Sequence, residues 1–141
     1  MKKIKRGEIR LCNLGDGIGS IQGGLRPALV IQNNKGNKHS PFVIVIPITS
    51  KTDCKAKLPT HLVLTKSMGL KQQSLLLTEQ IITINRKDVG KLLTTLSPKV
   101  MEVVDKKIGI SINLKPQKHK NLYFRKKHHQ QIESYSRRKT L

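Results

Sequence analysis

The sequence predicts a mainly β fold, a small barrel of five to seven short strands followed by a single C-terminal helix. Between residues 8 and 96 the apolar residues fall in short runs separated by Gly, Asn, Pro and charged residues, which is typical of strands. After residue 97 the spacing changes to one apolar residue every three or four positions, which predicts a helix. Strands this short bury their apolar faces most readily by closing into a barrel with the helix packed against it.

The first half of the chain predicts a hairpin with a long connection. Glu8–Leu14 is the first strand, and residues 15–24 (GDGIGSIQGG) hold five glycines in ten positions, which predicts a flexible loop. The second strand, Pro27–Gln32, opens on a proline, where the missing N–H does little harm. Asn33–Asn37 (NNKGN) predicts a turn.

The middle of the chain predicts the centre of the sheet. Pro41–Thr49 is apolar on both faces, as expected of a strand buried on two sides. The charged segment Lys51–Lys57 predicts a loop. Further strand is predicted at His61–Leu64, across Ser74–Asn85, and at Lys91–Leu96.

The helix has clear start signals. Ser97 is a good N-cap, Pro98 suits the first helical position, and Leu96 before the cap can pack onto Met101. The predicted apolar face consists of Val100, Met101, Val104, Ile108 and Ile112.

Charge and composition restrict the partners. Lys and Arg number 28 against 8 Asp and Glu, a net charge of +20, which attracts phosphate backbones, anionic lipid or an acidic protein. No segment approaches the roughly 20 apolar residues that span a bilayer, and the charged N-terminus has no apolar run behind it. We therefore expect a cytoplasmic protein without membrane contact. The chain divides into a domain at 1–114, with a charge of +12, and a basic tail at 115–141, with +8, predicted to be disordered or loosely helical.

Two residues stand out as candidates for chemistry on a phosphate. Arg26 lies between the glycine-rich loop and the second strand, immediately before Pro27, so its backbone is restrained toward extended geometry. A restrained arginine can direct a planar, permanently charged fork at a phosphate, although an ion pair across the sheet would equally explain it. Thr49 ends the central strand, where its hydroxyl can donate to a phosphate oxygen or serve only the fold.

The remaining polar residues predict little chemistry. Glu79 lies in an apolar run, so we expect it to be buried beside a basic partner. His39 and His61 lie in or beside polar loops and are expected at the surface. Cys12 and Cys54 are expected to be reduced thiols. The sequence predicts no metal site and no cofactor: the ligand spacing is absent, and the glycine loop runs into a strand instead of a phosphate-binding helix.

Several motifs occur in an order that resembles a known family. An N-terminal RGEI, the glycine-rich loop, GGLRPALVIQNN, a strand ending in PIT, KLPTH and EQI follow one another between Arg6 and Leu114. In this series the chain resembles the MazF/PemK endoribonuclease toxins of type II toxin–antitoxin systems. The resemblance implies an SH3-like barrel of the CcdB/PemK type with a C-terminal helix, paired as a homodimer.

The resemblance also implies an activity and its partners. These are sequence-specific, metal-independent cleavage of single-stranded RNA (mRNA), inhibition by a labile antitoxin whose acidic peptide covers the RNA groove, and operator DNA binding only through the antitoxin complex. The family's catalytic arginine and threonine fall on Arg26 and Thr49. Residues expected to contact RNA are Gly19, Ser20, Gln22 and Pro27.

This chain departs from the family at two positions. Relatives often have Glu where this chain has Ile21, and Arg where it has Ile82, the latter near the implied dimer interface. Three other functions share the charge or the fold: a non-catalytic nucleic-acid-binding barrel, a toxin that poisons a protein such as a topoisomerase, and a ribosome-associated basic protein. The pair Arg26 and Thr49 favours the ribonuclease, because none of these three needs both residues.

Overall fold

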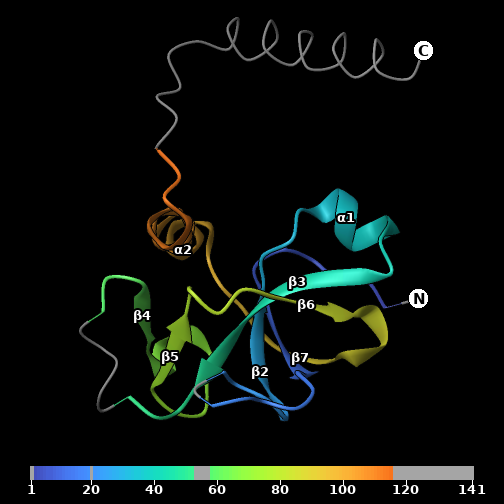
Figure 1. The fold of residues 1–141 in the computed structure, drawn as a ribbon, viewed down its shortest axis with the longest axis horizontal. Helices are drawn as coiled ribbons and strands as arrows, with labels where there is room; N and C mark the ends of the chain where they lie inside the picture. Colours follow the sequence, from blue (N-terminus) through green and yellow to red (C-terminus); the bar gives the residue numbers. More distant parts are fainter. Residues whose placement is uncertain (1, 20, 53–57, 116–141) are drawn as a thin grey trace, which may run out of the picture.

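The computed structural model describes residues 2–19, 21–52 and 58–115, and these form a strongly curved antiparallel sheet with one long helix (Figure 1). The sheet has seven strands in the order β4-β5-β3-β2-β1-β7, with β6 pairing β3 off this path. The elements are β1 (Glu8–Asn13), β2 (Leu25–Val30), α1 (Asn34–His39), β3 (Phe42–Thr49), β4 (His61–Leu64), η1 (Lys66–Met68), β5 (Ser74–Leu77), β6 (Ile82–Asn85), η2 (Arg86–Asp88), β7 (Val89–Thr95) and α2 (Pro98–Ile112).

Strand β3 is the centre of the sheet, which confirms the prediction for Pro41–Thr49. It pairs with β2 along one edge, where Leu29 lies opposite Ile46. Along the other edge its first half pairs with β6 and its last two residues pair with β5. From Val45 to Thr49 every residue is buried, as the uninterrupted apolar sequence predicts.

The apolar side chains form two clusters, one on each side of β2 and β3, because successive side chains of a strand point to opposite faces. The first cluster lies under α2. It contains Ile9, Leu29, Ile46, Ile48, Leu64, Leu76, Leu96, Met101 and Val104. The second cluster lies on the opposite face. It contains Ile4, Cys12, Ala28, Val30, Val43, Val45, Ile84 and Val89.

Helix α2 begins as predicted. The Ser97 hydroxyl accepts a hydrogen bond from the Val100 N–H at 3.3 Å, and Pro98 takes the first helical position. Met101 and Val104 are buried, but Ile112, expected on the apolar face, is exposed. The helix ends at its C-cap Asn113, which has the left-handed conformation with φ 57°. No helix among the described residues is long and apolar enough to cross a membrane.

Two predicted segments have a different structure. The turn expected at Asn33–Asn37 is the start of the short helix α1, because the Asn33 side chain accepts a hydrogen bond from the Gly36 N–H at 2.8 Å and caps it. The strand expected across Ser74–Asn85 is two strands, β5 and β6. A turn in which the Gln80 N–H donates to the Leu77 carbonyl at 2.8 Å separates them.

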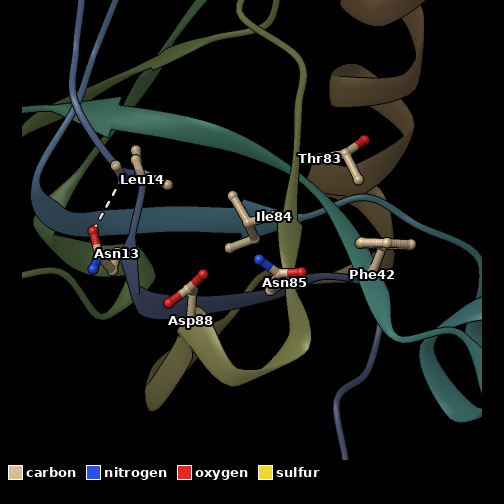
Figure 2. A pocket seen from close by; sticks show the side chains of 8 residues that line it. Asn13, Leu14, Phe42, Thr83, Ile84, Asn85 and Asp88 are labelled. Atoms are coloured by element: carbon tan, nitrogen blue, oxygen red, sulfur yellow. Dashed lines mark hydrogen bonds between the residues drawn. The ribbon is translucent and has the colours of Figure 1, made fainter.

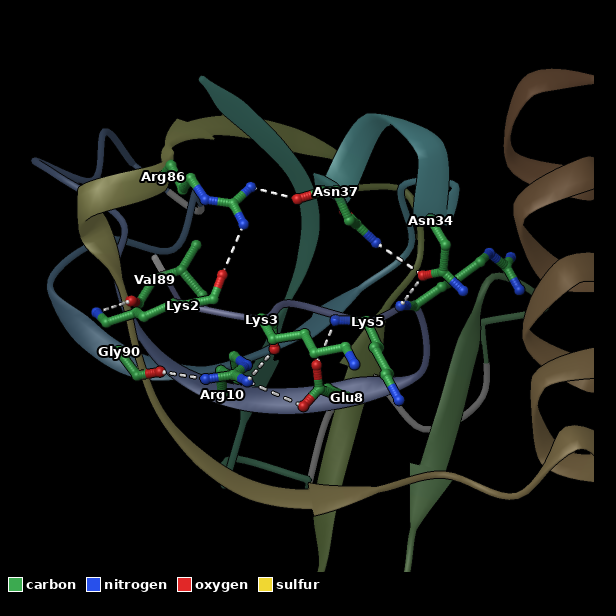
Figure 3. Close-up of polar contacts among 11 residues, drawn as sticks. Lys2, Lys3, Lys5, Glu8, Arg10, Asn34, Asn37, Arg86, Val89 and Gly90 are labelled. Atoms are coloured by element: carbon green, nitrogen blue, oxygen red, sulfur yellow. Dashed lines mark hydrogen bonds and ion pairs between the residues drawn. The ribbon is translucent and has the colours of Figure 1, made fainter. Parts of the chain in front are cut away.

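The segment before β1 is held by side chains from the rest of the domain (Figure 3). The Arg10 guanidinium donates to the Lys3 carbonyl at 3.0 Å, and the Arg86 guanidinium donates to the Lys2 carbonyl at 2.7 Å. Directly after these two lysines, Ile4 is buried in the second cluster. The N-terminal residues therefore belong to the packed domain, which the sequence did not predict. Except for Lys115, the predicted tail lies outside the described residues, as does Cys54.

Candidate active site

Arg26 lies in β2 at the edge of the glycine-rich loop, and its half-buried side chain is held by that loop. Its Nε donates to the Gly23 carbonyl at 2.8 Å, and its Nη1 donates to the side-chain oxygen of Gln22. Arg26 takes part in none of the ion pairs found among the described residues. The cross-sheet ion pair is therefore not what holds this arginine in the described structure.

Thr49 is the last residue of β3 and is 6% exposed. Its hydroxyl oxygen accepts a hydrogen bond from the Lys51 N–H at 3.2 Å, and its backbone lies opposite Leu75 of β5. The hydroxyl proton is left to point elsewhere, because a threonine hydroxyl accepts and donates at the same time.

The pairing of β2 with β3 brings these two residues to the same place. Ala28 lies opposite Pro47 in this antiparallel pair. The observed β2–β3 pairing ends there; continued two residues further along each strand, the same register would set Arg26 opposite Thr49. Positions directly opposite in such a pair have their side chains on the same face of the sheet. Arg26 and Thr49 therefore lie toward the same end of the β2–β3 pair.

The loop from residue 15 to 24 is closed at its base and docked at one point. The Leu14 N–H donates to the Gly24 carbonyl at 2.9 Å, and the Gly24 N–H donates to the Gly15 carbonyl at 2.7 Å. Further along, the Gln22 N–H donates to the side-chain oxygen of Gln80, in the turn between β5 and β6, at 3.1 Å. The loop therefore leaves β1, reaches the β5–β6 turn, and returns to Arg26.

The structure distributes the predicted RNA-contact residues unevenly around Arg26. Gln22 contacts the guanidinium directly. Gly19 has φ 58°, and a Cβ at this position would meet no other atom within 4 Å, so its surroundings are open. Pro27 lies opposite Leu11 in β1 and, as the neighbour of Arg26 in a strand, points to the other face. Ser20 lies outside the described residues.

A histidine–glutamate pair next to the docked loop is the feature that sequence reasoning missed. His61 was expected at the surface, but it is 4% exposed, in β4, while His39 is exposed as expected. Its Nε2 lies 2.5 Å from Oε1 of Glu79. Glu79 was expected to be buried, but its side chain is 37% exposed, because it lies in the β5–β6 turn. The β4–β5 register could have indicated this contact. It sets His61 opposite Leu77, so Glu79, two residues after Leu77, lies at the same end of the β4–β5 pair as His61.

This pair changes the acidity of the carboxyl group. Partial burial of Glu79 acts to raise its pKa, but the hydrogen bond with His61, a backbone N–H, the charge of His61 and the Thr60 hydroxyl outweigh it. The pKa of Glu79 is therefore lower than its usual value of 4.5.

The comparison with protein families is decisive for the classification. Residues 5–112 match the model of the PemK-like, MazF-like toxins of type II toxin–antitoxin systems. The chain belongs to this family. A relative from Staphylococcus saprophyticus, the endoribonuclease MazF, is 45% identical over 112 residues, which are 79% of this chain and 92% of the relative. The expectation of an enzyme of the endoribonuclease class is confirmed at this level.

Solved structures of similar fold support the architecture. A MazF structure from Deinococcus radiodurans has a TM-score of 0.68 at 23% identity and covers 80% of this chain and 99% of its own. A structure described as an endoribonuclease in complex with its cognate antitoxin, from a Mycobacterial species, has a TM-score of 0.67 at 22% identity, covering 81% and 99%. The predicted fold class, a mainly β barrel of this toxin family with a C-terminal helix, is confirmed.

Two surface depressions are found among the described residues. One of about 280 Å³ opens between the end of β1 and strand β6 (Figure 2). A second depression of about 350 Å³ lies beside η1 and β7. Neither depression is lined by Arg26 or Thr49. Among the described residues no three His, Cys, Asp or Glu side chains gather as metal ligands would. The depression in Figure 2 is lined by Asn13, Leu14, Gly15, Phe42, Thr83, Ile84, Asn85 and Asp88.

Proposed function

We propose that this toxin-family member cleaves single-stranded mRNA at short sequence motifs, without metal, and that Arg26 and Thr49 are its catalytic residues. The observation that supports the proposal is the β2–β3 register, which pairs Ala28 with Pro47 and, continued two residues further, would set the arginine opposite the threonine on one face. The guanidinium is oriented there by Gly23 and Gln22. A planar cation beside a hydroxyl matches the oxygens of a phosphodiester.

The reaction uses the nucleophile that RNA itself carries. The 2′-OH releases its proton to solvent as its oxygen attacks the adjacent phosphorus in line with the 5′-oxygen, whose bond to phosphorus breaks, so the products end in a 2′,3′-cyclic phosphate and a 5′-OH. Arg26 stabilises the charge on the phosphoryl oxygens and gives a proton to the leaving 5′-oxygen, and Thr49 holds a non-bridging oxygen. A guanidinium carries five N–H donors and no acceptor, so Arg26 acts here as a proton donor and regains its proton from solvent.

The geometry leaves the guanidinium able to do this. Arg26 has five N–H donors, and its hydrogen bonds to Gly23 and Gln22 use two of them. In the part of the chain that the structure describes, three donors remain for a substrate phosphate. The base contacts would come from the loop and its edges, through Gly19, Ser20, Gln22 and Pro27, because unpaired RNA exposes its base edges.

Further parts of the proposal concern partners and organisation. We propose a homodimer in the cytoplasm, with the domain at residues 1–114 and the basic tail at 115–141 as an extension that adds non-specific RNA affinity. An acidic peptide of a cognate antitoxin would cover the RNA groove, and operator DNA would be bound only through that complex. A solved structure of the same fold, described as an endoribonuclease in complex with its cognate antitoxin, supports an antitoxin as partner.

The test is cleavage of a long single-stranded RNA by the purified chain in EDTA. Discrete fragments with cyclic phosphate ends are expected, and a single 2′-deoxynucleotide at the cut site should block cleavage there. Arg26→Ala and Thr49→Ala should each lower the rate at least about 100-fold, whereas Lys91→Ala, at an exposed position of β7, should not.

Two results would contradict the proposal. Full activity of Arg26→Ala would show that another group carries the charge. Intact RNA that only shifts in a gel would identify a binding protein without nuclease activity.

A further inference from the structure

A series of contacts connects the buried side chain of His61 with the guanidinium of Arg26. His61, whose side chain is 1% exposed, lies 2.5 Å from the Glu79 carboxylate. Glu79 and Gln80 are neighbours in the β5–β6 turn. The side-chain oxygen of Gln80 accepts the Gln22 N–H at 3.1 Å, and the Gln22 side chain accepts a hydrogen bond from Arg26.

The turn at the middle of this series is fixed from two sides. The Gln80 N–H donates to the Leu77 carbonyl at 2.8 Å, which closes the turn. The Thr78 hydroxyl donates to the Thr60 carbonyl and lies 3.2 Å from the Ser111 hydroxyl of α2. His61 holds the Glu79 carboxylate on the other side. Gln80 therefore projects from a turn whose two preceding residues are both tied to β4 or its flank.

The loop that carries Arg26's partners needs such an anchor. Five glycines between residues 15 and 24 give this segment a large conformational entropy to lose. Its base is closed by hydrogen bonds at Leu14 and Gly24, but Gln22 takes part in neither of them. The contact from Gln80 ties the Gln22 backbone to the β5–β6 turn.

We propose that Gln80 positions the Arg26 guanidinium through Gln22, and that His61 and Glu79 hold the turn from which Gln80 projects. This proposal rests on the proposed function for the role of Arg26 in cleavage. His61 is a positioning residue here and not a proton carrier for substrate, because its Nε2 faces Glu79 and its side chain is closed to the surface.

The experiment combines a direct view of the guanidinium with steady-state kinetics. The Arg26 Nε–H resonance is followed in the ¹⁵N-labelled full-length chain, since this proton is hydrogen-bonded to the Gly23 carbonyl. The variants are Gln80→Ala, Glu79→Gln and His61→Ala, and the control is Gln73→Ala, an exposed glutamine just before β5. Glu79→Gln keeps the test valid if His61→Ala does not fold, because Glu79 lies at the surface.

Positioning predicts a particular pattern. Gln80→Ala and Glu79→Gln should shift or broaden the Arg26 resonance and lower kcat about tenfold with KM changed less than twofold, because misplaced groups slow chemistry more than they weaken binding. In the double variant Gln80→Ala/Glu79→Gln, kcat should fall by no more than in the more affected single variant, because both changes act through one series of contacts. Gln73→Ala should alter neither readout.

The outcomes separate this inference from the proposed function. An Arg26 resonance unchanged in both Gln80→Ala and Glu79→Gln would overturn the positioning role, whatever the kinetics. Multiplicative kinetic losses in the double variant would also overturn it. RNA left intact by the unmodified chain would instead overturn the proposed function, and the resonance would still report whether Gln80 orients Arg26.

Discussion

Glu8 and Arg10 form an ion pair at 3.0 Å in which the two side chains are only 7% and 11% exposed. The residues are two apart in β1, so they lie on the same face. Arg10 also donates to the carbonyls of Lys3 and Gly90, each at 3.0 Å. One guanidinium therefore joins the N-terminal segment, β1 and β7 (Figure 3).

Removing this guanidinium should destabilise the domain strongly. Arg10→Ala leaves the Glu8 carboxylate buried without its charge partner, and we expect a loss of about 3 to 5 kcal/mol in the free energy of unfolding. Urea denaturation measures it, with the exposed Lys91→Ala as the control. A loss below about 1 kcal/mol would show that water replaces the missing hydrogen bonds.

Gly69 should not tolerate a side chain. It has φ +92°, and a Cβ there would lie 2.3 Å from the Thr94 hydroxyl oxygen. Gly69→Ala adds this clash to the backbone strain, so we expect a loss of about 2 kcal/mol or more. Gly15→Ala is the matched control, with φ +73° and no atom within 4 Å, and it should lose only the backbone part. Equal losses in thermal unfolding would mean that Thr94 moves aside freely.

The low pKa of Glu79 predicts a contribution to stability that depends on pH. Its pKa is below 4.5 in the folded chain, so the folded state favours the ionised carboxylate. This contribution is complete above pH 4.5 and is lost as the pH falls through the folded-state pKa. The urea midpoints of the unmodified chain and Glu79→Gln should therefore differ most near about pH 6 and converge toward about pH 3. A constant difference over that range would contradict the assignment.

The basic tail should set part of the salt dependence of RNA binding. Residues 115–141 contain nine Lys or Arg and one Glu. Deleting them should flatten the slope of log Kd against log salt concentration, by about 0.7 for each phosphate of single-stranded RNA that the tail neutralises. Fluorescence anisotropy in the Arg26→Ala background measures binding without cleavage. The fragment pattern of the truncated active chain should stay the same, and a steeper slope would refute the role.

Local patterns in the sequence predicted most elements of the fold. Alternation and apolar runs identify β1 to β4 and β7, because strand signals are local and β3 has no polar face. The start of α2 was predictable because Ser97 and Pro98 act within one turn of their own positions. The break between β5 and β6 was not, because apolar runs lie on both sides of residues 78–80 and the turn depends on contacts with β4 and its flank and with α2.

The candidate site divides in the same way. Arg26 and Thr49 could be singled out because each lies near a strand end, and the antiparallel β2–β3 pairing places these two strand ends at the same end of the sheet. His61 and Glu79, by contrast, are 18 residues apart in the sequence. Their contact depends on the packing of β4 against the β5–β6 turn. Burial of a single histidine is a property of packing, which residue types in a short window do not specify.

Strand β3 pairs with three other strands, and this has a consequence for local unfolding of the domain. Its backbone amides are shared among β2, β5 and β6, whose residues span positions 25 to 85. No part of this strand can be opened without separating segments that are far apart in the chain. Deuterium should therefore enter the β3 amides only when the whole domain unfolds, while those of α1 and the ends of α2 exchange by local fraying. Thr49 thus stands on the slowest-exchanging strand, and Arg26 beside the loop that is richest in glycine.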